Sequence, residues 1–283
     1  MKERFFWIAL GLIAVSWTLN SLYSQSKQLT EPIFLDHYIE MTMGDHNYHL
    51  TLYYLTNKND RSRISHVRLG GLDGYPENGF IYNDNSIYNM DTYRHHVLRS
   101  VSVRLQNYET DIMTDLILND MVVYFSDGRQ TNASIGEVII HPEGYFTQGN
   151  NVLHSRSSGS SNDSSSWYSF QAIEPLSIEK ILFPFNEPIE ERFNFTINDS
   201  QKDKSLESLK LPIHIDKDKY LTLRTNLKTN SFVNPYAFSI RIDGTTEQGK
   251  PFTSYAHYHM FPYLTQEDVN RVIDKKARRD SVE

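Results

Sequence analysis

Two histidines near the end of the chain, His257 and His259, have the spacing of a metal-binding pair. In an extended strand, residues two positions apart point to the same face, so both imidazoles would lie on one side of a sheet. Two imidazoles on one face can bind zinc or copper together with a third ligand, such as His214 or a carboxylate. The alternative is an aromatic strand face without metal, because Tyr255 continues the same alternation. We expect any metal site to be centred on His257 and His259.

A second group of residues suited to recognition is aromatic. It lies in a long segment, residues 70–99, that is dense in Gly, Asn, Asp and Tyr. Aromatic rings supply contact area at low entropic cost, and loops on β-sandwiches commonly carry binding sites. Such a loop can contact a protein or stack on sugars; alternatively, its rings only pack the loop onto the sheet. We expect the ligand-binding residues to be Tyr75, Phe80, Tyr82, Tyr88 and Tyr93.

Sequence motifs for known catalytic chemistry are absent, among them G-x-S-x-G, H-E-x-x-H, the P-loop and the dinucleotide fingerprint. The chain has no Cys, which excludes thiol nucleophiles, disulfides and Cys-ligated zinc or iron–sulfur sites. The adjacent carboxylates Glu190 and Glu191 lie in a polar segment, which is typical of a solvated surface and not of an acid/base pair. We therefore expect no catalytic residue and no cofactor, and a protein that acts by binding.

Short strands must position these groups. Runs of aromatic and β-branched residues alternate with turns made of Gly, Asn and Asp along most of the chain. Asp127-Gly128, between the runs 121–125 and 135–140, is a hairpin signal. This pattern predicts a mainly β protein with two β-sandwich-like (Ig-like) domains, residues 27–150 and 167–263. The Ser-rich stretch between them, residues 151–166, has little apolar area to bury, and we expect a loop or linker there.

The last segment, residues 264–283, is expected to form a short C-terminal helix and a tail. Thr265 is a suitable N-cap, and Asp268 three residues later completes a pattern that resembles a capping box. A narrow apolar face follows at helical spacing, formed by Val269, Val272 and Ile273.

The N-terminal segment, residues 1–26, has the features of a signal-anchor or transmembrane segment. Lys2 and Arg4 form a short positive region, and the predominantly apolar run 5–23 follows. A helix over this run would be roughly 28 Å long at about 1.5 Å per residue, close to the thickness of a bilayer core. The positive-inside rule then places residues 27–283 outside the cytoplasmic membrane.

Two other interpretations of the N-terminal segment stay open. It can be a signal peptide cleaved at the small residues of 24–26, which would make the protein secreted. It can also be a buried helix, although its length and flanking charges disfavour this. The anchor and the cleaved signal agree that residues 27–283 are extracytoplasmic.

The charge balance restricts the partner. The chain carries 28 basic and 35 acidic side chains, a net charge of −7, which argues against a nucleic-acid-binding surface. The lack of Cys fits export from a bacterium that does not rely on disulfides. We expect a non-catalytic, membrane-anchored binding protein of the bacterial cell envelope, whose partner is another membrane or envelope protein. Two alternatives are a carbohydrate- or cell-wall-binding module that uses the aromatic segment for a polysaccharide, and a metal-dependent hydrolase centred on His257 and His259.

Overall fold

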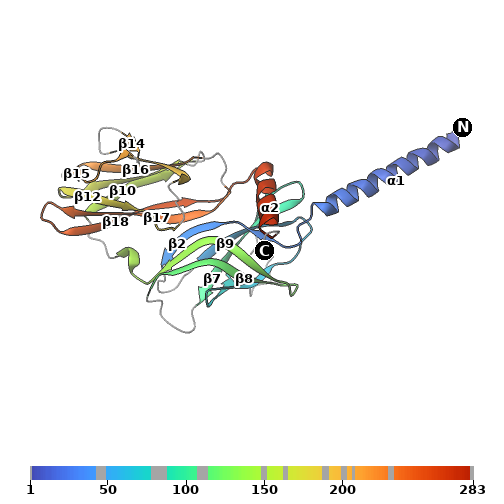
Figure 1. Cartoon of the computed structure of the whole chain (residues 1–283), viewed down its shortest axis with the longest axis horizontal. Helices are drawn as coiled ribbons and strands as arrows, with labels where there is room; N and C mark the ends of the chain where they lie inside the picture. Colours follow the sequence, from blue (N-terminus) through green and yellow to red (C-terminus); the bar gives the residue numbers. More distant parts are fainter. Residues whose placement is uncertain are drawn as a thin grey trace.

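The computed structural model describes residues 2–42, 49–77, 88–106, 114–147, 152–161, 165–186, 191–198, 203–205, 208–228 and 233–280. Figure 1 shows a long helix, α1, extending from an elongated β-rich body that carries a second helix, α2. The elements run in the order α1 (Lys2–Ser26), β1 (Ile33–Phe34), β2 (His37–Thr42), β3 (His49–Asn57), β4 (Ile64–Leu69), β5 (Leu72–Pro76), β6 (Tyr88–Thr92), β7 (His96–Gln106), β8 (Leu116–Phe125), β9 (Gln130–His141), η1 (Tyr145–Thr147), β10 (Leu153–Ser160), β11 (Ser165–Ala172), β12 (Leu176–Leu182), β13 (Phe193–Asn198), β14 (Asp203–Ser205), β15 (Ile213–Ile215), β16 (Tyr220–Leu227), β17 (Tyr236–Thr246), β18 (Pro251–Met260) and α2 (Gln266–Asp280).

The predicted fold class is confirmed: the protein is mainly β, with two sheets, an N-terminal apolar helix and a short C-terminal helix. One sheet has thirteen strands, and its main path runs β1-β3-β7-β5-β4-β8-β9-β2-β17-β12-β15. β18 joins this sheet by pairing with β17, and β6 joins it by pairing with β7. The second sheet has five strands in the order β10-β11-β16-β13-β14.

The first half of the body encloses a hydrophobic core within a single curled stretch of the thirteen-stranded sheet (Figure 1). Alternate residues of the strands point inward, as the period-two pattern requires. Leu52 of β3, Val103 of β7 and Ile135 of β9 are fully buried in this core. The predicted Asp127-Gly128 hairpin joins β8 and β9, and Gly128 has a φ of 86° that suits glycine.

The second half has its core between two sheets. The five-stranded sheet lies over β17 and β18 (Figure 1). Phe170 and Phe193 come from the five-stranded sheet, and Phe238 and Ile242 come from the larger one. Stacked sheets of this kind bury side chains from both inner faces, which gives a sandwich-like core. The Ig-like character and the division into two domains stay predictions.

β2 links the two halves. It runs parallel to β9 on one side, with His37 opposite Gly136, and parallel to β17 on the other, with Tyr38 opposite Tyr236. The close approach of β2 to β9 requires a glycine at position 136. A Cβ there would lie 2.5 Å from the His37 carbonyl oxygen, and the φ of 84° also favours glycine. Tyr38 enters the second core, while β2 itself pairs with a strand of the first half.

The Ser-rich stretch 151–166 differs from the expected loop or linker. Leu153–Ser160 forms β10, the outer strand of the five-stranded sheet, and Ser165 begins β11. A strand is held by backbone hydrogen bonds, so an outer strand can be rich in serine without burying apolar area. Most β10 side chains are exposed, which agrees with this explanation.

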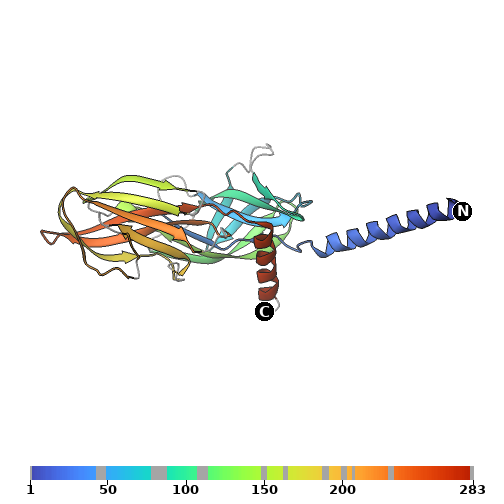
Figure 2. The same cartoon turned by 90° about the horizontal axis from the view of Figure 1, so that it is seen from above.

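The C-terminal helix begins as predicted. The Thr265 backbone N–H and hydroxyl donate to Asp268 Oδ2 at 2.8 and 2.7 Å, and the Asp268 N–H donates back to Thr265 Oγ1 at 3.2 Å. This is a capping box. Val269 is fully buried, and Val272 and Ile273 pack on the same cluster. Figure 2 shows α2 lying across the side of the body that is nearer to α1.

Candidate functional site

A histidine held between two carboxylates lies where β2, β9 and β17 meet. Glu40 belongs to β2, His141 is the last residue of β9, and Asp115 precedes β8. His141 Nε2 lies 2.9 Å from Glu40 Oε1, and His141 Nδ1 lies 2.7 Å from Asp115 Oδ1. An ionised carboxylate only accepts hydrogen bonds, so this geometry favours an imidazole that donates from both ring nitrogens. The arrangement is an ion pair with two acids sharing one cation.

Glu40 extends this ion pair to the second half of the body. Its Oε2 accepts a hydrogen bond of 2.7 Å from the backbone N–H of Ser239 in β17. The side chains of Glu40 and His141 are only 2% and 4% exposed, whereas that of Asp115 is 51% exposed. The Glu40–His141 pair is therefore shielded from solvent and connects three strands.

Aromatic rings cover the pair. Tyr145, in η1, stacks on the His141 ring with 3.7 Å between centroids and 3° between planes. Phe146 makes T-shaped contacts with Tyr255 at 5.0 Å and with His257 at 5.7 Å between centroids. We call these residues the junction cluster: Glu40, Asp115, His141, Tyr145, Phe146, Tyr255 and His257. Its rings come from η1 and β18, and they close the site over the buried charges.

Burial and hydrogen bonding shift the pKa values in this cluster in opposite directions. Burial lowers the pKa of His141, but the hydrogen bonds to Glu40 and Asp115 outweigh it, so this pKa is raised above its ordinary value. Burial lowers the pKa of His257, which keeps that imidazole neutral. The Glu40–His141 pair is buried beneath the Tyr145 ring and is closed to a substrate. Its geometry suits a structural role, in which it holds β2, β9 and β17 together.

The two histidines predicted to bind metal lie on one face of β18, as the alternation requires. His257 Nδ1 lies 2.8 Å from Ser239 Oγ, and the His259 ring contacts Phe261 at 4.4 Å. His214, the suggested third ligand, is on β15, which is separated from β18 by β17 and β12. Within the described ranges, no group of three or more His, Asp or Glu side chains is arranged to hold a metal ion. The metal site stays a prediction.

The predicted aromatic recognition residues do not share one environment. Tyr93 is 8% exposed, and its hydroxyl donates to the Leu264 carbonyl oxygen at 3.1 Å, so its ring packs beneath α2. Phe80 and Tyr82 lie outside the described residues. Tyr88 begins β6, with its backbone opposite Ser100, and its side chain is outside the described part.

Tyr75 lies in β5 and belongs to a row of stacked rings. His66 of β4 stacks on Tyr124 of β8 at 4.1 Å and 7°, and on Tyr75 at 5.9 Å and 24°. The three side chains are partly exposed on neighbouring strands of the first half. We call Tyr75, His66 and Tyr124 the ring row. Of these three, Tyr75 belongs to the predicted recognition residues, and the structure adds His66 and Tyr124.

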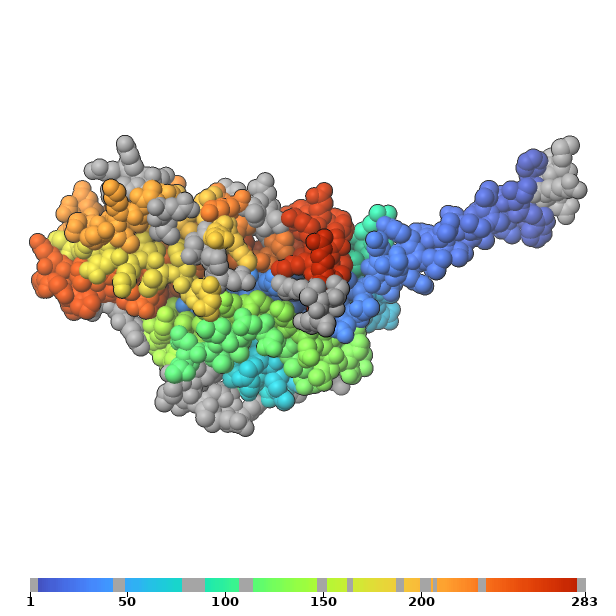
Figure 3. Space-filling view, viewed as in Figure 1, coloured from blue at the N-terminus to red at the C-terminus, as the bar shows by residue number. Residues whose placement is uncertain are grey.

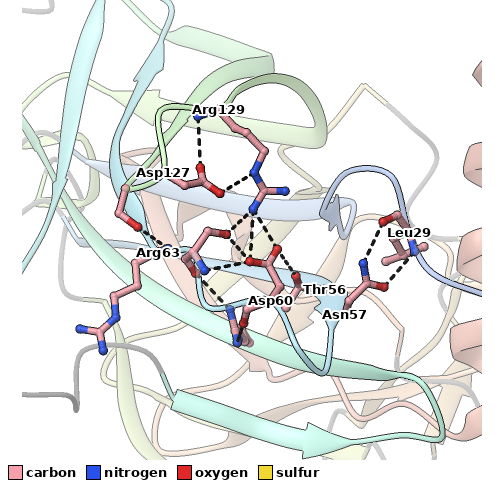
Figure 4. Close-up of polar contacts among 10 residues, drawn as sticks. Leu29, Thr56, Asn57, Asp60, Arg63, Asp127 and Arg129 are labelled. Atoms are coloured by element: carbon pink, nitrogen blue, oxygen red, sulfur yellow. Dashed lines mark hydrogen bonds and ion pairs between the residues drawn. The ribbon is translucent and has the colours of Figure 1, made fainter. Parts of the chain in front are cut away.

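A polar network lies near Leu29, which follows α1 by three residues (Figure 4). Arg129 Nη2 lies 3.0 Å from Asp60 Oδ2, and Arg129 Nε donates to Asp127 at 2.7 Å. Asp60 also accepts hydrogen bonds from the Ser62 backbone N–H and hydroxyl, at 2.8 and 2.6 Å, and from Thr56 at 3.0 Å. Burial acts to raise the pKa of Asp60, but the bonds from Ser62, Arg129 and Thr56 lower it to about 2.

The same region of the body holds the chain that leaves α1. The Asn57 side-chain amide exchanges two hydrogen bonds of 2.8 Å with the Leu29 backbone (Figure 4). His96 Nε2 donates to the Lys27 carbonyl oxygen at 2.9 Å, and the Tyr23 ring contacts His95 at 6.1 Å. The body therefore begins within a few residues of the helix end.

Two exposed aromatic side chains, Phe261 and Tyr263, lie between β18 and α2. They are 59% and 66% exposed, the highest values among large hydrophobic side chains outside α1 in the part of the chain that the structure describes. Leu264, the next residue, accepts the Tyr93 hydroxyl bond, and Gln266 accepts a 2.8 Å bond from the Arg94 N–H. The exposed ring pair, as we call Phe261 and Tyr263, thus lies near the α1 end of the body.

A pocket of about 230 Å³ lies between α2 and the first strand. Its lining includes Phe34, Ala133 and Val272, and a charged rim of Glu31 and Lys275. Lys275 Nζ also contacts Asp36 at 2.7 Å, which ties α2 to the segment before β2.

Comparison with known proteins finds no matching family model and no matching curated protein. Among solved structures, the chain is similar to a protein of unknown function from Porphyromonas gingivalis W83, at 10% identity over 81% of this chain and 96% of that one, with a TM-score of 0.20. It is also similar to the Enterococcus faecalis MSCRAMM ACE, at 9% identity over 85% and 97%, with a TM-score of 0.25. A third likeness is to SGBP-B of Bacteroides ovatus in complex with a mixed-linkage heptasaccharide, at 11% identity over 77% and 42%, with a TM-score of 0.22. At these TM-scores the likenesses carry no argument about function.

Proposed function

We propose that the chain is a non-catalytic, single-pass membrane-anchored protein of the bacterial cell envelope, whose extracytoplasmic body binds another membrane or envelope protein. Helix α1 supports the anchor. Its apolar stretch Phe5–Ser26 has 22 residues and a mean hydropathy of 1.6 in its most apolar window, none of which is buried (Figure 3). A predominantly apolar helix whose most apolar window is not buried against the protein suits a bilayer.

The exposed ring pair carries the binding part of the proposal. Phe261 and Tyr263 each expose more than half of their surface, and aromatic side chains of this kind are enriched at the centres of protein interfaces. The pair lies near the α1 end of the body, through the contacts of Leu264 and Gln266 with Tyr93 and Arg94. A partner held in the same membrane would therefore meet this surface at a high effective concentration.

A pull-down with matched variants tests this function. Native membranes carrying the full chain are crosslinked, solubilised and affinity-purified, with wild type beside the double variant Phe261→Ala/Tyr263→Ala. We expect a partner protein that co-purifies with wild type and is reduced at least tenfold in the double variant, because loss of a hot-spot ring costs about 2 kcal/mol or more. Tyr220→Ala is the control, since this Tyr is 48% exposed on β16, outside the ring pair. Equal recovery from wild type and the double variant would contradict the proposal.

A polysaccharide partner is the second candidate, and the ring row favours it. Tyr75, His66 and Tyr124 give partly exposed aromatic surface across three strands, of the kind that stacks on sugars. Under this alternative, Tyr75→Ala and Tyr124→Ala each weaken retention on cell-wall polysaccharide, while Tyr220→Ala does not. Unchanged retention in both ring-row variants would remove it.

A further inference from the structure

We propose that the end of the body next to α1 binds the anionic headgroups of membrane phospholipids through four exposed basic side chains. These are Lys27, Lys58, Arg61 and Arg94, which we name the basic collar. The inference rests on the proposed function in one respect, namely that α1 spans a membrane.

The contacts around the end of α1 place the basic collar close to the bilayer surface. Tyr23 lies within the apolar stretch of α1, and its ring contacts His95 of the body at 6.1 Å. Beyond the helix end, Lys27 is held by His96 at 2.9 Å. The body therefore contacts the span itself, without an intervening linker. Loops beside His95 then lie at the depth of lipid headgroups.

The collar residues come from the segments that make these contacts. The Lys58 backbone N–H donates to the His95 carbonyl oxygen at 3.2 Å, and Arg94 directly precedes His95. Arg61 follows in the same loop as Lys58, and that loop is fixed to Leu29 through the Asn57 amide. Figures 1 and 2 show this end of the body facing α1.

Two aspartates of this region are bound by a cation outside the collar. Arg129 forms ion pairs with Asp60 at 3.0 Å and with Asp127 at 2.7 Å. Within the described ranges, no collar residue forms an ion pair with a carboxylate; the Lys27 ammonium instead lies 5.6 Å from the centre of the Tyr23 ring. Exposed positive charge thus collects at one end of a chain whose net charge is −7.

An anionic bilayer surface is the ligand that fits this placement. Its negative potential attracts Lys and Arg held within about 10 Å, and each such side chain favours surface contact by roughly fivefold. The collar would draw the body onto the headgroups and fix its tilt relative to the membrane. The attraction is screened by salt, which provides a test.

Single-cysteine labelling suits the experiment because the chain has no Cys of its own. The full chain is reconstituted into nanodiscs of phosphatidylcholine alone or mixed with phosphatidylglycerol. A fluorophore is placed at Asn59→Cys, between Lys58 and Asp60, and nitroxide-headgroup lipid serves as the quencher. Gln248→Cys, in the turn between β17 and β18, reports on a site outside the collar.

We expect stronger quenching at position 59 in the anionic nanodiscs than in the neutral ones. This difference between the two lipids should disappear at high salt. The variant Lys58→Gln/Arg61→Gln/Arg94→Gln removes the difference, while Lys217→Gln/Lys219→Gln/Arg224→Gln, with three exposed basic residues of another surface, retains it. Quenching that is equal in both lipids, or that persists in the collar variant, overturns the inference. Release of the chain by alkaline carbonate overturns the anchor and the inference together, whereas resistance to carbonate with equal quenching overturns the collar alone.

Discussion

His141 and Glu40 form a buried ion pair, with His141 Nε2 2.9 Å from Glu40 Oε1, and this pair joins the two halves of the body. His141 ends a strand of the first half, while Glu40 accepts the Ser239 N–H of β17. A buried pair of this kind adds little net stability compared with an apolar core, but the loss of one partner is costly.

Replacement of Glu40 by Gln should lower the free energy of unfolding by about 3 kcal/mol. The change leaves the His141 charge with the exposed Asp115 alone, and a Gln amide nitrogen cannot accept the Ser239 N–H. Urea denaturation of the full chain in detergent, followed by tryptophan fluorescence, measures the effect. Asp115→Asn is the control and should cost less than about 1 kcal/mol, because that carboxylate is 51% exposed. Equal losses of stability from the two substitutions would contradict the greater role of the buried Glu40 compared with the exposed Asp115.

The contribution of His141 should decline in alkaline solution. Its folded-state pKa is raised above the ordinary value of 6.5, because its bonds to Glu40 and Asp115 outweigh the effect of burial. The stabilisation is therefore complete below pH 6.5 and is lost as the pH rises through the folded-state pKa. The difference in unfolding free energy between wild type and His141→Gln should shrink with rising pH. A difference that stays constant or grows with pH would contradict a raised pKa for His141.

His37 should limit stability on the acid side. Burial lowers its pKa to about 4, and its Nε2 accepts the Tyr53 backbone N–H at 2.9 Å, which requires an unprotonated nitrogen. Because the pKa of His37 is lower in the folded state, its contribution to the stability of the fold is complete above pH 6.5. This contribution falls by about 3 kcal/mol as the pH drops toward 4. NMR titration of the histidine resonances should find His37 unprotonated at pH 5. A midpoint near 6.5 would show that the ring is accessible to solvent.

Asp60→Asn should destabilise the protein by about 2 kcal/mol, since Asp60 accepts bonds from Ser62, Thr56 and Arg129 at once. Asp127→Asn removes the other carboxylate bound to Arg129 and is the matched control. The Asp127 side chain is 43% exposed against 13% for Asp60, so its loss should cost less than about 1 kcal/mol. Thermal unfolding of both variants in detergent compares them directly. A larger loss of stability in Asp127→Asn than in Asp60→Asn would show that Asp60 is not the main acceptor that stabilises this network.

Features set by near neighbours in the chain could be predicted from the sequence. The capping box of Thr265 and Asp268 and the turn at Asp127-Gly128 need only residues a few positions apart, and both form as expected. Strand alternation likewise predicted the shared face of His257 and His259. Local patterns report backbone conformation, and these elements depend on little else.

Features set by pairing across the fold could not be predicted in the same way. Glu40 and His141 are 101 positions apart, and neither residue belongs to a motif. β2 joins two strands far from it in sequence, although the alternation from Tyr38 to Thr42 was a signal that could have indicated a strand. β10 was missed because its serines do not report the backbone pairing that holds an outer strand. Tyr93, expected in a recognition surface, packs under α2 instead.

Site-specific photo-crosslinking tests the central claim, that a partner in the envelope covers Phe261 and Tyr263, most directly. A photoreactive amino acid replaces Tyr263 in the full chain, and Tyr220 in a control chain, and intact cells are irradiated. We expect one protein adduct from position 263 that is absent from position 220, because only the former lies in the exposed ring pair near α1. An identical set of adducts from both positions, or no protein adduct from position 263, would contradict the proposed function.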